Sequence, residues 1–158
     1  MTASDAAGNS VDYTEGEATT TSGVLSYNIT INGTAITNKN ADNVTGEWLK
    51  EGKISYDSQS KTLKLKDVKL ESANEGIVSS EPELAIELSG KNYVHATNVA
   101  VKLQQADVTF KGLGEIEITA DNAAAIALNN AALTIDQCAL KAKGKYGIQG
   151  SDVDKDSI

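Results

Sequence analysis

The sequence contains a single cysteine, a single proline and few aromatic residues. One thiol, Cys138, cannot form a disulfide within the chain, and it cannot supply a cysteine-rich metal site. Aromatic residues make up 4% of the 158 residues, so Val, Ile, Leu and Ala must build the core. Hydrophobic residues at 40% and charged residues at 23% are typical of a folded chain, and this length fits one domain with a sizeable core.

Arginine is absent, since all 14 basic residues are lysine, and the net charge is −8. This balance lacks the concentrated positive charge that displaces counterions from phosphates, so we expect no nucleic-acid partner. It also lacks the guanidinium fork that binds carboxylates and phosphates through two hydrogen bonds. No apolar run reaches the ~18 residues of a membrane span, and no signal-peptide core follows Met1.

Residues 1–23 are small, polar and rich in threonine, which predicts a flexible leader ahead of the folded part. Such a leader commonly follows an export signal that has been removed, and Met1 would then come from recombinant expression. We therefore expect an extracellular or cell-surface location, reached after removal of a signal that this sequence does not contain.

An internal repeat is the strongest pattern in the chain. In each unit, an apolar residue is followed at offsets of seven and nine by two further apolar residues. The units start at Ile77, Val101 and Ile126, which are 24 and 25 residues apart. The residues that follow are Leu84 and Ile86, Val108 and Phe110, and Leu133 and Ile135. A period in this range is typical of solenoids, in which each coil buries its apolar side against its neighbours.

A second spacing supports the repeat. Apolar residues at offsets of zero, two, five and seven occur near both ends of the repeated region. The sets are Leu63, Leu65, Val68 and Leu70, and Leu133, Ile135, Cys138 and Leu140. Matching these sets places Cys138 where Val68 stands, which predicts a buried thiol that acts as a small hydrophobic residue.

Apolar and polar residues alternate within each unit, as in LKLKDVKL and EIEIT. Alternation with a period of two predicts short strands with one buried face. At least two such strands fall in each period, whereas a leucine-rich repeat has one strand and an L-x-x-L-x-L frame. The sequence therefore predicts an all-β, right-handed parallel β-helix, or solenoid. A β-sandwich is the alternative, because its short strands recur at similar spacing.

Residues 24–56 are expected to form an N-terminal cap with a β-hairpin, and residues 57–158 to form the coils. Asn32-Gly33 lies between two alternating segments, and both residues tolerate the positive φ of a tight hairpin turn. Residues 42–50 are expected to form a short helical turn. No amphipathic helix covers the last coil, so we expect a fragment truncated at its C-terminus or association through the C-terminal coil edge.

Several segments resemble β-helical domains of secreted and cell-surface proteins from gut bacteria and clostridia. The resemblance covers roughly residues 25–150 and rests on YNITINGTAITNKNADNV, GKISYDSQSKTLKLKDVKLES and AIALNNAALTIDQCALKAKGKYGIQG. It implies a β-helix fold, an extracellular setting and an adhesin or carbohydrate-binding role, with calcium involved in some members. It assigns no ligand residue in this chain.

Asp152, Asp154 and Asp156 alternate near the C-terminus and form the candidate metal site. Carboxylates at every second residue can converge on Ca²⁺, which takes about 6–8 oxygen ligands. The segment lacks the glycine and the later glutamate of an EF-hand loop. Calcium is the only cofactor that the sequence suggests. Two further segments rich in Asn and Asp, 38–43 and 121–130, have the residue types of ordinary turns.

The candidates for ligand binding are Trp48, Tyr93, Tyr146, Asn129 and Asn130. Trp48 has a ring that can stack on a sugar or anchor the N-terminal cap. Tyr93 and Tyr146 each precede a corner of their coils, so they would form an aromatic platform if both project from one side of the stack. Asn129 and Asn130 belong to a coil corner, where Asn is also a common turn residue.

These features favour a non-catalytic extracellular surface domain, either an adhesin or a glycan-binding module. Its partner would be a polysaccharide or a host surface glycan or protein. The sequence does not separate this function from that of a purely structural spacer in a larger surface protein.

The alternative is an enzyme, either a polysaccharide lyase or a glycoside hydrolase, built on a β-helix. That chemistry needs paired carboxylates or a strong cationic base, whereas the acidic residues here are scattered and arginine is absent. The one histidine, His95, has no evident partner in the sequence and is expected at an exposed corner. We therefore predict no enzyme activity and no catalytic residue.

Overall fold

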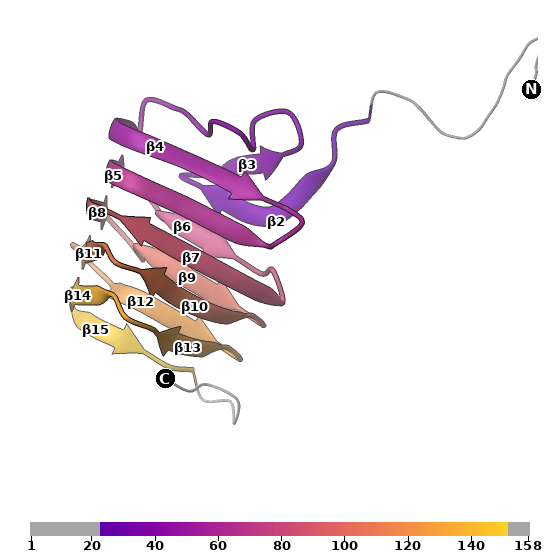
Figure 1. Cartoon of the computed structure of the whole chain (residues 1–158). Helices are drawn as coiled ribbons and strands as arrows, with labels where there is room; N and C mark the ends of the chain where they lie inside the picture. Colours follow the sequence, from indigo (N-terminus) through magenta and orange to yellow (C-terminus); the bar gives the residue numbers. More distant parts are fainter. Residues whose placement is uncertain (1–22, 152–158) are drawn as a thin grey trace, which may run out of the picture.

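The computed structural model describes residues 23–151, whose regular structure consists of β-strands (Figure 1). Along the chain these are β2 (Ser26–Ile31), β3 (Thr34–Thr37), β4 (Leu49–Asp57), β5 (Thr62–Ser72), β6 (Ile77–Ser79), β7 (Glu83–Ser89), β8 (Lys91–Ala96), β9 (Val101–Gln104), β10 (Asp107–Gly112), β11 (Glu115–Ala120), β12 (Ala124–Asn129), β13 (Ala132–Ile135), β14 (Ala139–Lys143) and β15 (Tyr146–Gln149). This range contains no helix that is long and apolar enough to cross a bilayer.

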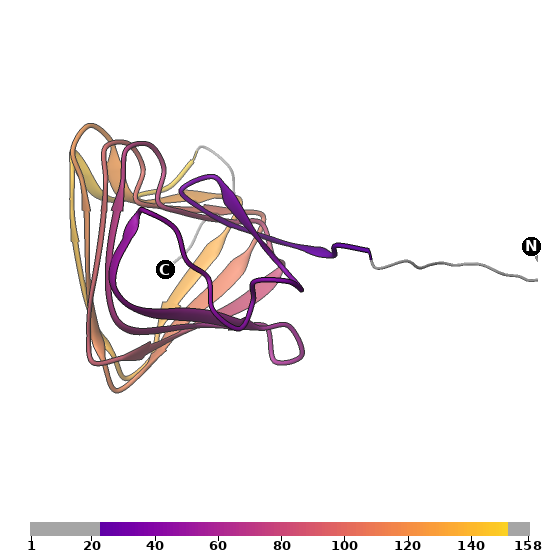
Figure 2. The same cartoon turned by 90° about the horizontal axis from the view of Figure 1, so that it is seen from above.

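Each coil contributes one strand to each of three walls around the core, as the view along the stack shows (Figure 2). Wall A consists of residues 62–66 of β5, then β7, β10 and β13. Wall B consists of residues 69–72 of β5, then β8, β11 and β14. Wall C consists of β6, β9, β12 and β15. All these pairings are parallel, which confirms the solenoid and makes the β-sandwich alternative wrong.

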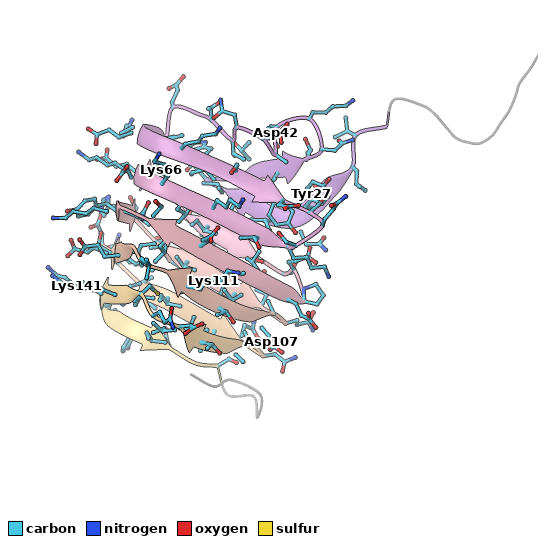
Figure 3. The ribbon with its side chains drawn as sticks, in the orientation of Figure 1. Tyr27, Asp42, Lys66, Asp107, Lys111 and Lys141 are labelled. Carbon is cyan, nitrogen blue, oxygen red and sulfur yellow. The ribbon has the colours of Figure 1, made fainter. Side chains whose placement is uncertain are left out.

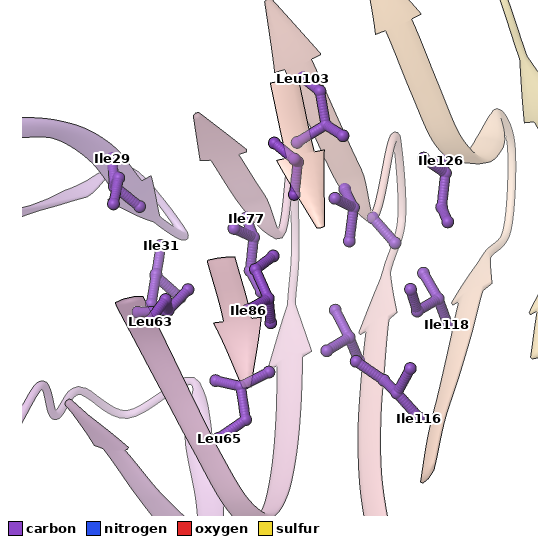
Figure 4. Packing of buried hydrophobic residues seen from close by; sticks show 14 of the residues in the cluster. Ile29, Ile31, Leu63, Leu65, Ile77, Ile86, Leu103, Ile116, Ile118 and Ile126 are labelled. Atoms are coloured by element: carbon purple, nitrogen blue, oxygen red, sulfur yellow. The ribbon is translucent and has the colours of Figure 1, made fainter. Parts of the chain in front are cut away.

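The register of wall C confirms the repeat. Ile77 pairs with Val101, and Val101 pairs with Ile126. All three side chains are buried and belong to the hydrophobic core. Figure 4 shows Ile77 and Ile126 among the aliphatic side chains of this core. Each coil removes the apolar face of the preceding coil from water, which stabilises the stack by about 25 cal/mol per Å² of apolar surface.

The second spacing predicts the right face of the strands but the wrong register. Leu63 pairs with Ile86, Ile86 with Phe110, and Phe110 with Ile135. The row that begins at Leu63 therefore ends at Ile135, two residues beyond the predicted match with Leu133. A shift of two residues leaves every side chain on the same face of its strand, so apolar alternation alone does not distinguish these registers.

Residues with positive φ turn the chain at the corners between walls. Asp67 and Gln137, with φ of 51° and 62°, lie between walls A and B. Gln105 and Asn130, with φ of 51° and 56°, lie between walls C and A in successive coils. Polar residues of these types tolerate the left-handed region better than β-branched residues do, so the strands can stay short and the coils sharp.

Antiparallel strands close the N-terminal end of the stack. The β2–β3 hairpin turns at Asn32 and Gly33, whose φ angles of 50° and 81° agree with the predicted tight turn. Strand β2 also pairs with β6, and β4 pairs with β5, both in the antiparallel sense. The predicted hairpin cap is therefore confirmed. Residues 42–50 form turns and the start of β4, so the predicted helical turn is wrong.

Candidate functional site

Rows of side chains run along the outer surface of wall B, one position per coil. The middle row contains Lys69, Tyr93, Glu117 and Lys141, and the rows beside it contain Lys91, Glu115 and Ala139, and Glu71, His95, Thr119 and Lys143. Neighbouring parallel strands lie about 4.8 Å apart, so consecutive side chains of one row are within reach of each other. We call this surface the wall B surface.

Tyr93 stands in the middle row and is 46% exposed. Its neighbours along β8, Asn92 and Val94, are buried at 1% each. Because successive side chains of a strand point to opposite faces, burial of these two neighbours directs Tyr93 outward. The alternation of β8 therefore fixes the position of the aromatic ring on the wall B surface.

Shallow hollows flank the Tyr93 side chain along the wall. Both are lined by Tyr93 and Glu117 together with charged or polar residues of β8 and of the neighbouring coils. One hollow also includes Lys91, Glu115 and Lys141, and the other also includes Lys69, Glu71, His95 and Thr119. The ring thus stands between two recesses that carry amine and carboxylate groups.

Lysine and glutamate side chains of the wall B surface pair with each other. The distances between the ammonium nitrogen and the carboxylate oxygen are 3.9 Å for Lys69–Glu71, 3.9 Å for Lys91–Glu115 and 3.5 Å for Lys143–Glu117. Exposed pairs of this kind contribute at most about 1 kcal/mol each, so they can rearrange at little cost to bind a polar ligand. Lys141 lies on β14, at the lower end of the stack (Figure 3).

His95 has a partner that the sequence did not reveal. Its Nε2 atom lies 3.0 Å from Oδ1 of Asp121 in the next coil, 26 residues away. The histidine is on strand β8, one residue before the strand ends, and its side chain is 44% exposed. A spacing close to one repeat is the signal that could have predicted this contact.

The predicted aromatic platform does not form, because Tyr93 and Tyr146 lie on different walls. Tyr93 belongs to β8 in wall B, whereas Tyr146 belongs to β15 in wall C, where it pairs with Ala124. Tyr146 is 48% exposed, and the Lys145 ammonium lies 5.9 Å from the centre of its ring. Each coil has three strands, so two corners of one coil need not share a side of the stack.

Asn129 and Asn130 lie at the corner between walls C and A, away from the wall B surface. The carbonyl of Asn129 accepts a 2.9 Å hydrogen bond from the backbone N–H of Gln105 in the preceding coil. Asn130 adopts the positive φ of that corner. Asp121 and Asn122, which the sequence grouped with them, lie at the opposite end of β12. These asparagines therefore have the role of turn residues.

Trp48 is 6% exposed and belongs to the hydrophobic cluster of the core. Its carbonyl accepts a 2.8 Å hydrogen bond from the backbone N–H of Glu71 in β5. A buried indole has no face open to a sugar ring. Trp48 therefore anchors the N-terminal cap to the first coil, which is one of the two roles that the sequence suggested.

The candidate calcium residues Asp152, Asp154 and Asp156 lie outside the described residues. Between residues 23 and 151, no group of three or more His, Cys, Asp or Glu side chains is arranged to hold a metal ion. In the Asn-rich segment 38–43, the Asn40 side chain accepts a 2.7 Å bond from the Thr37 N–H and donates a 3.1 Å bond to the Ala35 carbonyl. That segment is an ordinary turn.

Cys138 is a partly buried residue of the last coil that packs against the core. Burial raises the pKa of its thiol above the usual value, and hydrogen bonds to backbone groups oppose this rise. The residue that continues the row of Val68 is Leu140, through Asn92 and Ile116, so the predicted equivalence of Cys138 and Val68 is wrong.

A ladder of asparagines at the corner between walls B and C was not predicted. The Asn98 side chain donates a 2.7 Å hydrogen bond to the side-chain oxygen of Asn74, 24 residues earlier. Asn122 follows after a further 24 residues, and its backbone N–H bonds to the carbonyl of Thr97. The recurrence of asparagine at the repeat length is a signal that the sequence contained.

Comparisons of this chain with protein-family models, with curated proteins and with solved structures gave no match.

Proposed function

We propose that this chain is a non-catalytic extracellular module that binds an extended carbohydrate chain along the wall B surface. The observation that carries the proposal is the exposed ring of Tyr93 between two hollows lined by lysine and glutamate. An aromatic ring offers an apolar face to one side of a sugar, and amines and carboxylates hydrogen-bond to its hydroxyl groups.

The direction of the bound chain follows from the rows. Lys69, Tyr93, Glu117 and Lys141 succeed one another along the stack axis, one per coil. Their spacing of about 4.8 Å is close to the length of one sugar unit in an extended chain. A linear glycan that crosses the strands would therefore place successive sugars over successive coils, with one sugar on the Tyr93 ring.

The charge of the wall B surface favours a neutral glycan. Lysines and glutamates alternate in and between its rows, and three ion pairs join them. An acidic glycan would have to compete with these glutamates for the lysines. The sequence also lacks arginine, the residue best suited to bind carboxylates through two hydrogen bonds.

The sequence supports an extracellular setting for this activity. The polar leader of residues 1–23 and the resemblance to bacterial cell-surface β-helical domains both favour it. Binding through a shallow, exposed surface is weak at each site, and several copies on one surface would increase the overall strength. We therefore propose an adhesin that attaches to a polysaccharide or a host glycan.

A rigid spacer is the second candidate function. It is favoured by the continuous rows of buried aliphatic residues, which pass from the capped end through the coils. A spacer needs no ligand, so binding experiments separate it from the carbohydrate-binding module. The lyase or hydrolase alternative is tested by incubating the chain with the same glycans and measuring the release of reducing ends.

A glycan array followed by titration calorimetry tests the proposal. We expect neutral linear glycans to bind. Tyr93→Ala should raise the dissociation constant for a soluble oligosaccharide by at least about tenfold, which corresponds to a loss of about 1.4 kcal/mol of binding free energy. Tyr93→Phe retains the ring and should retain most of the affinity. The same affinity is expected with EDTA and with calcium, because the wall B surface does not include the candidate calcium residues.

Tyr146→Ala is the matched control, since Tyr146 has nearly the same exposure as Tyr93 but belongs to wall C. We expect it to bind the soluble oligosaccharide like the unchanged chain. Equal losses for both tyrosines would place the binding surface elsewhere. No binding to any glycan would leave the spacer, and cleavage of a glycan would show an enzyme.

A further inference from the structure

A larger hollow lies on the outer surface at the corner between walls A and B, and we call it the corner hollow. Its volume is about 600 Å³, within the range of about 300–1,000 Å³ that is typical of ligand sites. Three lysines and one glutamate line it, namely Lys53, Lys64, Lys66 and Glu87. Glu87 is the register partner of Lys64 in the next coil. The charges that face the corner hollow are therefore mostly positive, although the chain has a net charge of −8.

Two of these lysines stand directly opposite each other near the capped end of the stack (Figure 3). Lys53 of β4 and Lys66 of β5 are register partners in an antiparallel pair, and the neighbouring Ile54 and Leu65 are buried. Because side chains alternate along both strands, the two ammonium groups share the outer face. Like charges directly opposite each other destabilise a sheet, so folding stability does not explain this arrangement.

Carboxylates of the chain do not neutralise the lysine pair. Within residues 23–151, five lysines form ion pairs with glutamates, whereas the three lysines of the corner hollow take part in none. Lys64 interacts electrostatically with Asp57. Asp67 follows Lys66 in the chain, but it accepts a 3.2 Å hydrogen bond from the backbone N–H that begins β8 and does not line the corner hollow. Lys53 and Lys66 are therefore the charges available to a partner.

An exposed apolar side chain lies at the other end of the corner hollow. Leu113 is 92% exposed, more than any other large hydrophobic residue between 23 and 151, and it lines the hollow together with the glycines on either side of it. The stretch between Leu113 and Lys66 is lined by the small residues Ser89 and Gly90. The corner hollow thus joins positive charge at one end to apolar surface at the other.

We infer that the corner hollow binds a short acidic segment of a partner protein. An apolar side chain of the segment packs on Leu113, and its carboxylates pair with the ammonium groups of Lys53 and Lys66. Pairs of this kind are favourable because the lysines have no carboxylate partner of their own to give up. The inference concerns a different surface from the proposed carbohydrate binding and does not depend on it.

Two observations favour an acidic polypeptide over a nucleic acid or a sulfated glycan. Leu113 offers neither a hydrogen bond nor an aromatic ring, so it suits an aliphatic side chain better than a sugar or a phosphate. The net charge of −8 also repels a partner that is negatively charged along its whole length. A segment with a few carboxylates places its charge at the corner hollow alone.

The spacing of the strands gives the spacing of the recognised residues. Neighbouring strands lie about 4.8 Å apart, so Lys66 is two strands, or about 10 Å, from Leu113, and Lys53 is one strand further. An extended peptide rises about 3.3 Å per residue. The acidic residues of the segment should therefore lie about three to five positions from the apolar residue.

Fluorescence anisotropy with labelled synthetic peptides tests this inference on the 158-residue chain. We expect Leu-Ser-Gly-Glu-Glu-Glu, or its reverse, to bind. Peptides with Ser for Leu, or with Gln for Glu, should bind at least about tenfold more weakly. Raising the salt concentration from about 50 mM to about 500 mM should weaken binding, because salt screens exposed charges. If neither acidic peptide bound at about 1 mM, or if heparin or single-stranded DNA bound more tightly, the inference would be overturned.

Charge reversal separates recognition from folding. Lys53→Glu and Lys66→Glu should each weaken binding of the acidic peptide at least about tenfold. The melting temperature of each variant should nevertheless stay equal or rise, because an unlike pair replaces a like pair across the two strands. The double variant should instead prefer the peptide in which Lys replaces Glu. Unchanged affinity for the acidic peptide in Lys53→Glu and Lys66→Glu would overturn the inference.

Lys39→Glu is the matched control for net charge. Lys39 is exposed in the turn after β3 and does not line the corner hollow, so this variant should bind the acidic peptide like the unchanged chain. Leu113→Ser tests the apolar contact and should reduce the affinity to that of the peptide with Ser for Leu. Equal losses in Lys39→Glu and Lys53→Glu would show an effect of net charge alone and would overturn the inference, as would full affinity in Leu113→Ser.

Discussion

The side-chain oxygen of Asn92 accepts a 2.9 Å hydrogen bond from the backbone N–H of Val68, one coil earlier. The amide nitrogen of Asn92 donates to the carbonyl of Ser89 at 3.3 Å and to that of Glu115 in the next coil at 3.1 Å. Asn92 is 1% exposed and occupies a row whose other members are apolar. One buried amide therefore joins the corners of three successive coils.

Replacing this amide should cost stability even when the new side chain is apolar. Asn92→Leu leaves the Val68 N–H and the Glu115 carbonyl without this partner, and each buried unpaired group costs about 1–3 kcal/mol. We expect a fall of about 2–4 kcal/mol in the free energy of unfolding, measured by urea denaturation. Asn98→Ala removes an exposed amide and should cost less than about 1 kcal/mol. If the Asn92→Leu variant were as stable as the unchanged chain, this role would be contradicted.

In the row that begins at Leu63, the same Ile→Ala substitution can be made at a fully buried position and at a partly exposed one. Ile86 is 0% exposed in the middle of the stack, and Ile135 is 41% exposed in the last coil. Ile86→Ala should lower the free energy of unfolding by about 2–5 kcal/mol, because it leaves a cavity between packed coils. Ile135→Ala should cost less than half as much, because less of this side chain is buried. Equal costs for the two substitutions would contradict the difference in burial between Ile86 and Ile135.

Tyr56 gives the cap a dependence on alkaline pH. The pKa of its phenol is raised from the usual 10.0 to about 12, mostly by burial and in smaller part by the negative charge of Glu81 and by Tyr27 and Asp57. The folded chain therefore keeps a proton that the unfolded chain releases. Because the unfolded state binds fewer protons in this range, stability falls as pH rises from about 10 towards about 12.

Comparison with Tyr56→Phe isolates this effect from the other groups that titrate at alkaline pH. Between about pH 9 and about pH 12, the melting temperature of the unchanged chain should fall more steeply than that of the phenylalanine variant. At neutral pH the two curves are expected to differ by a constant amount. Parallel curves over the whole range would show that the phenol titrates normally.

Gly76 marks a close approach between neighbouring coils. A Cβ atom added there would overlap the backbone carbonyl of Ala100 in the next coil, which cannot move without shifting wall C. Gly76→Ala should therefore destabilise the chain by more than about 2 kcal/mol, since overpacking against backbone forces such shifts. Gly33→Ala is the control: its φ of 81° costs about 1 kcal/mol, but the added atom meets open space. Calorimetric melting of both variants measures the difference.

The repeat made the solenoid predictable because burial requires the apolar residues of each coil to recur. The same inward position is occupied by Ile77, Val101 and Ile126 in successive coils, so the spacing between them gives the number of residues in one coil. The Asn-Gly turn was predictable for a local reason, since few residues adopt two successive positive φ angles. Both features depend on constraints that act within short segments or repeat along the chain.

The same pattern does not predict the register of wall A, nor which residues share one side of the stack. Shifting Leu63 from Ile135 to Leu133 leaves the apolar pattern intact, so only the corners, where the number of residues varies, determine the register. The number of walls decides whether Tyr93 and Tyr146 share a surface, and alternation does not reveal it. Nor does alternation reveal contacts between coils, such as that of His95 with Asp121.

Disulfide trapping tests the stacking of the coils most directly. His95 and Thr119 are register partners on the outer face of neighbouring coils, so cysteines at both positions, in a Cys138→Ser background, lie within the reach of a disulfide. Stacked coils predict a rapid intramolecular bond for this pair and none for cysteines at Thr109 and Thr119, which belong to different walls of one coil. Cysteines at 95 and 119 that stay reduced, or a disulfide that forms equally fast between 109 and 119, would contradict the stacked coils.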